Sequence, residues 1–285
     1  MRKTEKADCE DTHFYIDNAP PREVSQVLRV LSVENALTPN DIAKIMADEY
    51  GFKMQKHHEF SPRRLYDLGL AHQERQGPRV TYKLTERGLK LQTIQAMDLS
   101  LATDLLHYLH YTGYYGNPQY RKYLWSYRRC CEHIWLNGQL ILAARLAAMI
   151  QAEIGANFPH LDFGAKLGMR FNSTAASCVS TWLHALDPPP FIKSNKTLQP
   201  RLVQRFELAL LALDDTYRSR QYRYGDAVLM DDSLLNQTAR VFFLDPSCCT
   251  DLLRLAARIV PSIKISDTLG GASINLLKPF TVDDI

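Results

Sequence analysis

Residues 61–70 have the sequence SPRRLYDLGL, and residues 82–88 have the sequence YKLTERG. In the first motif, Ser61 can cap a helix, Pro62 suits its first turn, and Gly69 can end it in a left-handed conformation. After Gly69 the spacing of apolar residues changes from a helical period to the alternation typical of strands. The sequence therefore predicts a short helix followed by extended structure.

The segment after Gly69 predicts a hairpin and a further helix. Residues 72–75 and 80–84 flank Gln76-Gly77-Pro78, where glycine and proline indicate a turn between two strands. Thr85 follows the second strand and has a side chain suited to capping the next helix.

Two helices are predicted before residue 61. Residues 22–33 follow Pro21 and repeat apolar side chains at intervals of three and four, which predicts an amphipathic helix. Residues 38–51 begin with Thr38-Pro39 and end at Gly51, and their apolar stripe predicts a second helix. Three helices followed by a two-stranded hairpin is the order of elements in a winged helix-turn-helix domain.

This region resembles the winged helix-turn-helix domain of bacterial transcription regulators over about residues 20–95, roughly a quarter of the chain. Residues 65–70, the hairpin and residues 82–88 are similar to the end of the recognition helix, the wing and the closing helix of that family. The resemblance implies binding of double-stranded DNA, with the recognition helix in the major groove. The helix after Ser61 is short for this pattern, so residues 52–60 either extend it or form a loop.

The distribution of charge favours a polyanionic partner. The chain has 285 residues and a net charge of +3, but residues 1–50 contain six basic and ten acidic side chains. Residues 52–90 contain nine basic side chains against four acidic ones. A local surplus of this kind is typical of a surface that binds nucleic acid. A solvated charged face is the alternative.

The predicted DNA-binding residues lie on or before the short helix and along the wing. Paired hydrogen bonds from a guanidinium to guanine favour Arg63 and Arg64, which we place on the outer face of the first turn. Arg75 and Arg79 flank the wing tip, within reach of phosphates or the minor groove. The full predicted set is Gln55, Lys56, His57, His58, Ser61, Arg63, Arg64, Arg75, Arg79 and Lys83.

Residues 97–200 predict a helical domain. The segment Gly113-Tyr-Tyr-Gly-Asn-Pro118 predicts a break between modules. Residues 118–135 interleave aromatic and basic side chains, which suits either a single-strand-binding surface or, as we favour, packing. Predicted helices over residues 140–150, 163–168 and 172–186 have the order of a degenerate second winged helix, whose third helix exposes small polar residues. Two functions are open to such a module: binding DNA and contacting another protein.

Residues 201–285 predict a C-terminal α+β module. Helices are predicted over residues 201–218, 231–242 and 247–259, and a hairpin is predicted around Gly270-Gly271. Residues 1–19 are expected to form an N-terminal tail, and residues 20–96 the winged domain. The predicted fold class is mainly α with short β-hairpins, in a multi-module winged helix-turn-helix architecture.

The six cysteines are Cys9, Cys130, Cys131, Cys178, Cys248 and Cys249. Because none has a C-x-x-C spacing, we interpret them as small buried hydrophobic residues. The alternative is a metal site that combines Cys130 and Cys131 with nearby histidines, namely His107, His110 and His133.

No catalytic signature is found: the sequence lacks the phosphate-binding and zinc-protease motifs. The acidic pairs Asp214-Asp215 and Asp231-Asp232 are interpreted as helix caps and solvated surface, and Asp245 as a turn residue before Pro246. We therefore expect no enzyme activity, no metal and no cofactor.

The chain contains no apolar stretch of membrane-spanning length and no signal peptide, so a cytoplasmic location is expected. The predicted function is sequence-specific binding of double-stranded DNA by a prokaryotic transcriptional regulator. It is expected to act as a homodimer, or with a protein partner, through residues 97–285. The alternatives are a non-catalytic DNA-binding or adaptor subunit of a defence or mobile-element complex, and a replication initiator.

Overall fold

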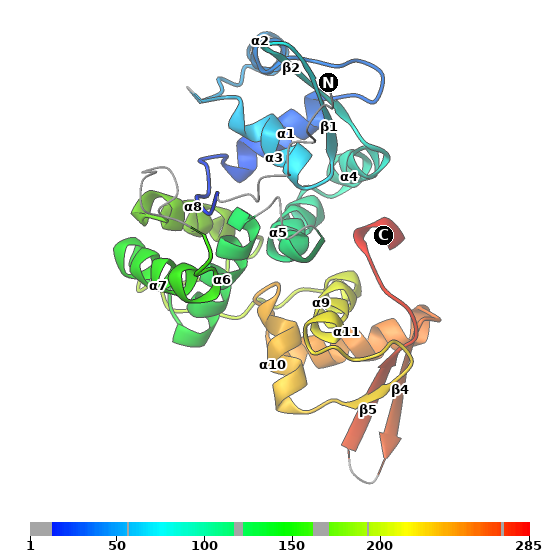
Figure 1. Ribbon diagram of the computed structural model, residues 1–285. Coiled ribbons are helices and arrows are strands. Elements are labelled where there is room, and N and C mark those ends of the chain that lie inside the picture. The colour runs from blue at the N-terminus through cyan, green and yellow to red at the C-terminus, as the bar shows by residue number, and fades with distance from the viewer. Residues whose placement is uncertain (1–12, 56, 117–121, 162–170, 193, 269–270) are drawn as a thin grey trace, which may run out of the picture.

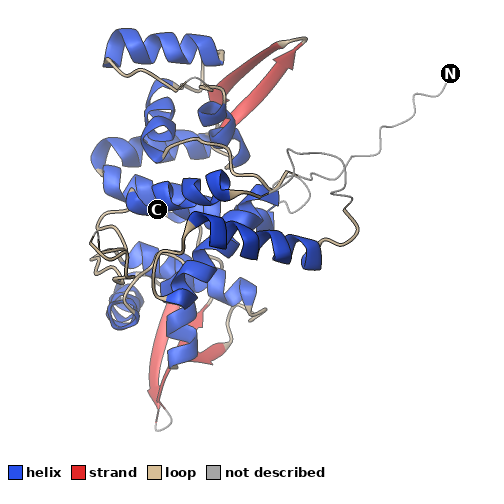
Figure 2. Ribbon diagram, turned by 90° about the vertical axis from the view of Figure 1, so that its left-hand side faces the viewer, coloured by secondary structure: helices blue, strands red, loops and turns tan. Residues whose placement is uncertain are grey.

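The computed structural model describes residues 13–55, 57–116, 122–161, 171–192, 194–268 and 271–285. Over these residues the chain forms eleven α-helices and two small antiparallel sheets. The predicted fold class, mainly α with short hairpins, is confirmed. Three groups of helices follow one another along the molecule, and the two hairpins lie at its opposite ends (Figures 1 and 2).

The N-terminal unit contains the predicted elements in the predicted order. They are α1 (Pro21–Val30), α2 (Pro39–Tyr50), α3 (Phe60–Asp67), β1 (Ala71–Gln76), β2 (Arg79–Leu84) and α4 (Glu86–Met97). Thr38 and Asp41 form a capping box at the start of α2, and Thr85 caps α4 by accepting a hydrogen bond from the Gly88 amide. Gly51, Gly69 and Gly77 have positive φ angles, as their predicted cap and turn positions require.

One further strand contact in this unit was not predicted. Leu37, between α1 and α2, forms an antiparallel bridge with Tyr82 of β2. The Leu37 amide donates to the Tyr82 carbonyl at 2.9 Å, and the Tyr82 amide donates back at 2.8 Å. The hairpin thus has a third, single-residue strand along its β2 edge.

The start of α3 differs from the prediction. The helix begins at Phe60 with Glu59 at its N-cap, so Ser61 lies inside its first turn and does not cap it. The Ser61 hydroxyl instead donates to Glu23 Oε1 of α1 at 2.6 Å in the interior. Residues 52–55 and 57–59 form a loop and a turn, so they do not extend α3.

The middle unit consists of α5 (Leu99–Gly116), α6 (Lys122–Asn137), α7 (Ala143–Asn157) and α8 (Ser173–His184). Of the break predicted over residues 113–118, residues 113–116 are instead the last turn of α5, and residues 117–118 lie outside the described residues. A Cβ atom at Gly113 would lie 2.8 Å from Leu124 Cδ1, so this glycine allows α5 and α6 to pack closely. The predicted helix over residues 163–168 lies outside the described residues, whereas α8 is present and is capped by Asn172.

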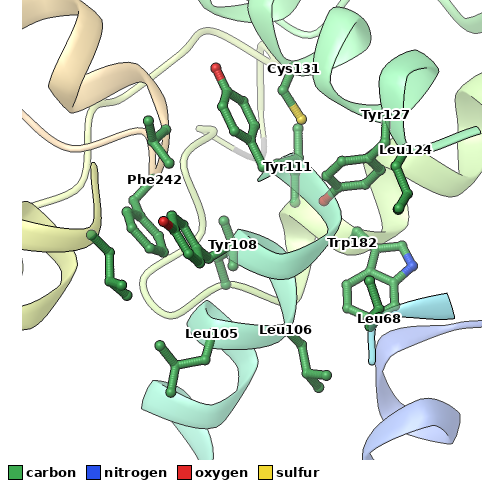
Figure 3. Packing of buried hydrophobic residues seen from close by; sticks show 14 of the residues in the cluster. Leu68, Leu105, Leu106, Tyr108, Tyr111, Leu124, Tyr127, Cys131, Trp182 and Phe242 are labelled. Carbon is green, nitrogen blue, oxygen red and sulfur yellow. The ribbon is translucent and has the colours of Figure 1, made fainter. Parts of the chain in front are cut away.

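Helix α5 packs at the centre of the core (Figure 3). Tyr108 of α5 stacks on Phe242 of the C-terminal unit with ring centroids 5.6 Å apart. Trp182 of α8 donates its indole N–H to the Ala19 carbonyl, in the segment before α1, at 3.1 Å. Phe14 and Ile16 are also fully buried, and the Phe14 ring contacts Trp125 of α6, so the expected N-terminal tail is wrong for this segment.

The C-terminal unit contains α9 (Phe206–Ser219), β3 (Ala227–Leu229), α10 (Asp232–Arg240), α11 (Pro246–Ile259), β4 (Ile263–Thr268), β5 (Gly271–Leu276) and a 3-10 turn, η2 (Val282–Asp284). The helices and hairpin were predicted, although α9 begins five residues later than expected. Strand β3 was not predicted, because three residues are too few to display an alternation. The sheet has the order β3-β5-β4. No helix in the described part of the chain has the length and apolarity needed to cross a bilayer.

Candidate nucleic-acid interface

The β1–β2 hairpin projects from the N-terminal unit and has two different faces (Figure 2). Antiparallel pairing places Arg75 opposite Val80, on the face whose base is formed by the buried residues Tyr82 and Leu84. Arg79, opposite Gln76, lies on the other face. Both arginines are exposed next to the turn, so the tip carries a guanidinium on each side.

Helix α3 places one arginine toward the same hairpin. Arg63 is exposed and lies 3.9 Å from the Asp67 carboxylate, one helical turn away. Burial raises the pKa of Tyr82, while the positive charges of Arg63 and Arg75 lower it. Since both arginines act on the same phenol, both lie near the Tyr82 hydroxyl. The Tyr82 hydroxyl accepts a hydrogen bond from the Gln73 amide at 2.8 Å.

Helix α2 adds a lysine that the sequence-based set omitted. Lys44 is exposed on the side of α2 away from the buried residues Ile42 and Met46. Hydrogen bonds from Thr38 lower the pKa of Asp41, and the charges of Arg79 and Lys44 lower it further. Asp41 thus has Arg79 of the β1–β2 hairpin and Lys44 of its own helix as neighbouring charges. The polar face of the predicted amphipathic helix was the available signal for Lys44.

Arg64 does not lie where it was predicted. Its side chain is only 2% exposed, with its guanidinium carbon 4.2 Å from the centre of the Tyr123 ring and Nη2 donating to the Asp17 carbonyl at 3.1 Å. The predicted outer-face position of Arg64 is wrong, because α3 packs this side against α6. Ser61 is also buried, so neither side chain faces solvent.

The remaining predicted residues have local partners. Gln55 accepts from Asn18 at 2.9 Å, His58 pairs with Asn40 at 2.9 Å, and Lys83 forms an ion pair with Glu74 at 3.0 Å across the hairpin. His57 is exposed and stacks on Phe60. Lys56 lies outside the described residues. The exposed cations of α2, α3 and the β1–β2 hairpin are thus Lys44, Arg63, Arg75 and Arg79.

The acidic pair Asp214-Asp215 is buried rather than solvated, which corrects the sequence interpretation. Asp215 forms an ion pair with Arg128 of α6 at 2.8 Å. Asp214 accepts from Tyr224 at 2.8 Å and pairs with Arg218 at 2.8 Å. By contrast, Asp231 and Asp245 cap α10 and α11.

The cysteine and histidine candidates are packing residues. Cys130, Cys131, Cys178 and Cys249 are buried without disulfides, as predicted, and burial raises the pKa of each thiol. Cys248 is half-buried, and Cys9 is not among the described residues. His133 pairs with Glu153 at 2.7 Å. Within the described ranges, no three His, Cys, Asp or Glu side chains are grouped as metal ligands would be.

The aromatic segment of α6 is also part of the core. Tyr123, Tyr127 and Arg128 are buried, which supports packing rather than a single-strand-binding surface for these residues. On α8, Ser177 and Thr181 are exposed, but their hydroxyls donate to carbonyl oxygens one turn earlier. This arrangement reduces their capacity to donate to phosphate.

Comparison with known proteins identifies a fold and no family. No protein-family model and no curated protein matches the sequence. A solved structure described as magnesium ion-bound SspB is similar, with a TM-score of 0.56 and 11% identity, over 97% of this chain and 88% of that one. A second SspB structure has a TM-score of 0.55 and 11% identity, over 93% and 85%. The chain therefore shares the overall fold of SspB.

Proposed function

We propose that this chain binds double-stranded DNA through its N-terminal unit, interpreted as a winged helix-turn-helix domain. The observation that carries the proposal is the projecting hairpin, whose tip has Arg75 and Arg79 exposed on its two faces. The third-strand contact of Leu37 with β2 supports the winged interpretation, because it completes the small sheet beside the three helices. Arginine on such a wing reaches phosphates or the minor groove of a duplex.

The burial of Arg64 and Ser61 shifts the proposed contact toward the wing. Arg63 remains on the exposed side of α3, where it can reach a base edge or a phosphate. Lys44 and the two wing arginines add exposed positive charge to the same unit. In this arrangement backbone contacts supply most of the affinity, and Arg63 supplies the sequence preference.

Replacing Arg75 and Arg79 together with alanine is expected to weaken duplex binding without changing the fold. Loss of two phosphate contacts makes the negative slope of log affinity against log salt concentration less steep by roughly 1.8. Fluorescence anisotropy with a labelled duplex, measured over a salt series, gives this slope. The matched control is Arg145→Ala with Arg223→Ala, which removes two exposed arginines from other elements. If the Arg75/Arg79 variant and the Arg145/Arg223 control have equal salt slopes, the wing does not contact the DNA.

The proposed role is sequence-specific regulation of transcription by a cytoplasmic homodimer. A non-catalytic subunit of a defence or mobile-element complex and a replication initiator are the alternative roles. Leu136 and Leu142 support self-association, because they flank the turn at Gly138 and are 74% and 72% exposed. Replacing both with aspartate is expected to lower the mass measured by sedimentation equilibrium to that of one chain. A wild-type protein that is already monomeric, alone and on DNA, would exclude the dimer.

We propose that the chain binds DNA and does not cleave it. One similar structure is described as magnesium ion-bound, so magnesium is the ion to test. In this chain the carboxylates of Asp214 and Asp215 are occupied by Arg218 and Arg128. Supercoiled plasmid incubated with the protein and Mg²⁺ is expected to stay supercoiled. Nicking that EDTA abolishes would contradict the non-catalytic part and leave DNA binding standing.

A further inference from the structure

The two ends of the chain repeat one structural arrangement. Each hairpin has two six-residue strands joined by two residues, and β1 and β2 correspond to β4 and β5 with a constant offset of 192 residues. The preceding helices α3 and α11 end at Asp67 and Ile259, which have the same offset. Residues 60–85 therefore correspond to residues 252–277 without insertion or deletion.

Hydrogen bonds support this correspondence. Leu37 pairs with the fourth residue of β2, and Val228 of β3 pairs with the fourth residue of β5. The Thr85 amide donates to the Leu70 carbonyl at 3.0 Å, and the equivalent Leu277 amide donates to the Ser262 carbonyl at 2.8 Å. Strands β2 and β5 also share one pattern of buried and exposed positions. The C-terminal unit is thus a second copy of the N-terminal arrangement.

The two equivalent helices differ in what surrounds them. Pro62 of α3 is buried and Tyr66 is half-buried, whereas their equivalents on α11, Arg254 and Arg258, are both exposed. Helix α11 is also longer, with 14 residues against 8. Arg64, the α3 residue that contacts Tyr123 of α6, corresponds to Ala256, which is also buried. The C-terminal helix therefore exposes two positions, 254 and 258, whose equivalents on α3 are buried or half-buried.

Basic side chains line the exposed side of α11. Arg254 and Arg258 are one helical turn apart, and together with Lys264 of β4 they border a cleft of about 400 Å³. Arg254 is paired with Asp267 at 3.1 Å, while Arg258 and Lys264 have no ion pair with any described residue. Leu255 and Ile259 on the same helix are 41% and 56% exposed.

We propose that α11 and β4 form a second surface for double-stranded DNA, with α11 as the helix that enters the groove. The proposal rests on duplex DNA being the ligand of the N-terminal unit. Arg258 and Lys264 provide charge for phosphates, and Leu255 and Ile259 provide apolar groups for thymine methyls. Because the hairpins lie at opposite ends of the molecule (Figure 2), the two surfaces contact separate segments of DNA.

The test is the double variant Arg258→Ala with Lys264→Ala in the full chain. Affinity for a labelled mixed-sequence duplex is measured by anisotropy over a salt series. Loss of two phosphate contacts is expected to make the negative salt slope less steep by roughly 1.8, in addition to the change caused by the Arg75/Arg79 variant. The control is again Arg145→Ala with Arg223→Ala. Arg223 precedes β3, which pairs with the edge of β5 opposite to β4.

The outcomes separate this inference from the function on which it rests. If wild-type protein does not bind the duplex, the proposed function fails. If wild-type protein binds but the Arg258/Lys264 variant has the same affinity and slope as the control, the second surface is excluded and the wing proposal stands. All four side chains are exposed, and equal thermal midpoints confirm that each variant is folded.

Discussion

Replacing Arg201 with alanine is expected to lower the free energy of unfolding by about 3–5 kcal/mol. Arg201 is fully buried, and its guanidinium forms an ion pair with Asp104 of α5 at 2.8 Å. It also donates to the carbonyls of Asp187, Pro188 and Phe242. The variant would leave a buried carboxylate and three carbonyl groups without this partner. The effect is large because one side chain joins the middle and C-terminal units.

Urea unfolding followed by circular dichroism measures this loss. The control is Arg254→Ala, which removes an arginine from the surface pair with Asp267 and is expected to leave the midpoint unchanged. A second variant, Arg201→Ala with Asp104→Leu, removes the stranded carboxylate and is expected to recover part of the stability. Equal midpoints for Arg201→Ala and the control would refute the role of Arg201 as a junction.

Acidification between pH 6.5 and about 4 is expected to destabilise the fold through the buried histidines of α5. Burial lowers the pKa of His107 from 6.5 to about 4, and burial lowers that of His110 well below 6.5. His107 donates from Nε2 to the Val241 carbonyl at 2.8 Å and accepts from the Tyr127 hydroxyl at Nδ1. This arrangement fixes the neutral tautomer.

The sign follows from proton uptake. Below pH 6.5 the unfolded chain binds a proton at each histidine while the folded chain does not, so stability falls with pH. For His107 the full shift corresponds to about 3 kcal/mol, present above pH 6.5 and lost as pH falls toward about 4. Urea midpoints at successive pH values measure the loss of stability. The variant His107→Gln has an uncharged side chain and should reduce the dependence of the urea midpoint on pH. Stability independent of pH over this range would show that His107 takes up its proton in the folded chain.

The sequence predicted the N-terminal unit well because its elements are delimited by local signals. Thr38, Gly51, Gly69 and Thr85 act through their own backbone geometry, so a single chain reveals them. The arginines of the wing were predicted for the same reason, since the Gly77 turn places Arg75 and Arg79 beside it.

The exposure of individual side chains on α3 could not be predicted. Arg63 and Arg64 are adjacent and chemically identical, yet one faces solvent and the other contacts Tyr123. That choice depends on α6, which is distant in the sequence. Asp214 and Asp215 were misjudged for the same reason, because their partners Tyr224 and Arg128 lie on other elements.

The internal repeat is not visible in the sequence because equivalent positions hold different residues. Tyr82 corresponds to Ile274, and Pro62 corresponds to Arg254. Burial patterns and hydrogen bonds are retained while the side chains differ. Similarly, β3 and the Leu37 bridge depend on pairing with distant strands, which a periodicity argument cannot detect.

The most direct test of duplex binding is the affinity of the intact wild-type chain for double-stranded DNA as a function of salt. The exposed cations of α2, α3 and the β1–β2 hairpin are Lys44, Arg63, Arg75 and Arg79. With about 0.9 per phosphate contact, the slope of log affinity against log salt concentration is expected to be roughly −3.6. Absence of binding at low salt, or an affinity that does not change with salt, would contradict the account.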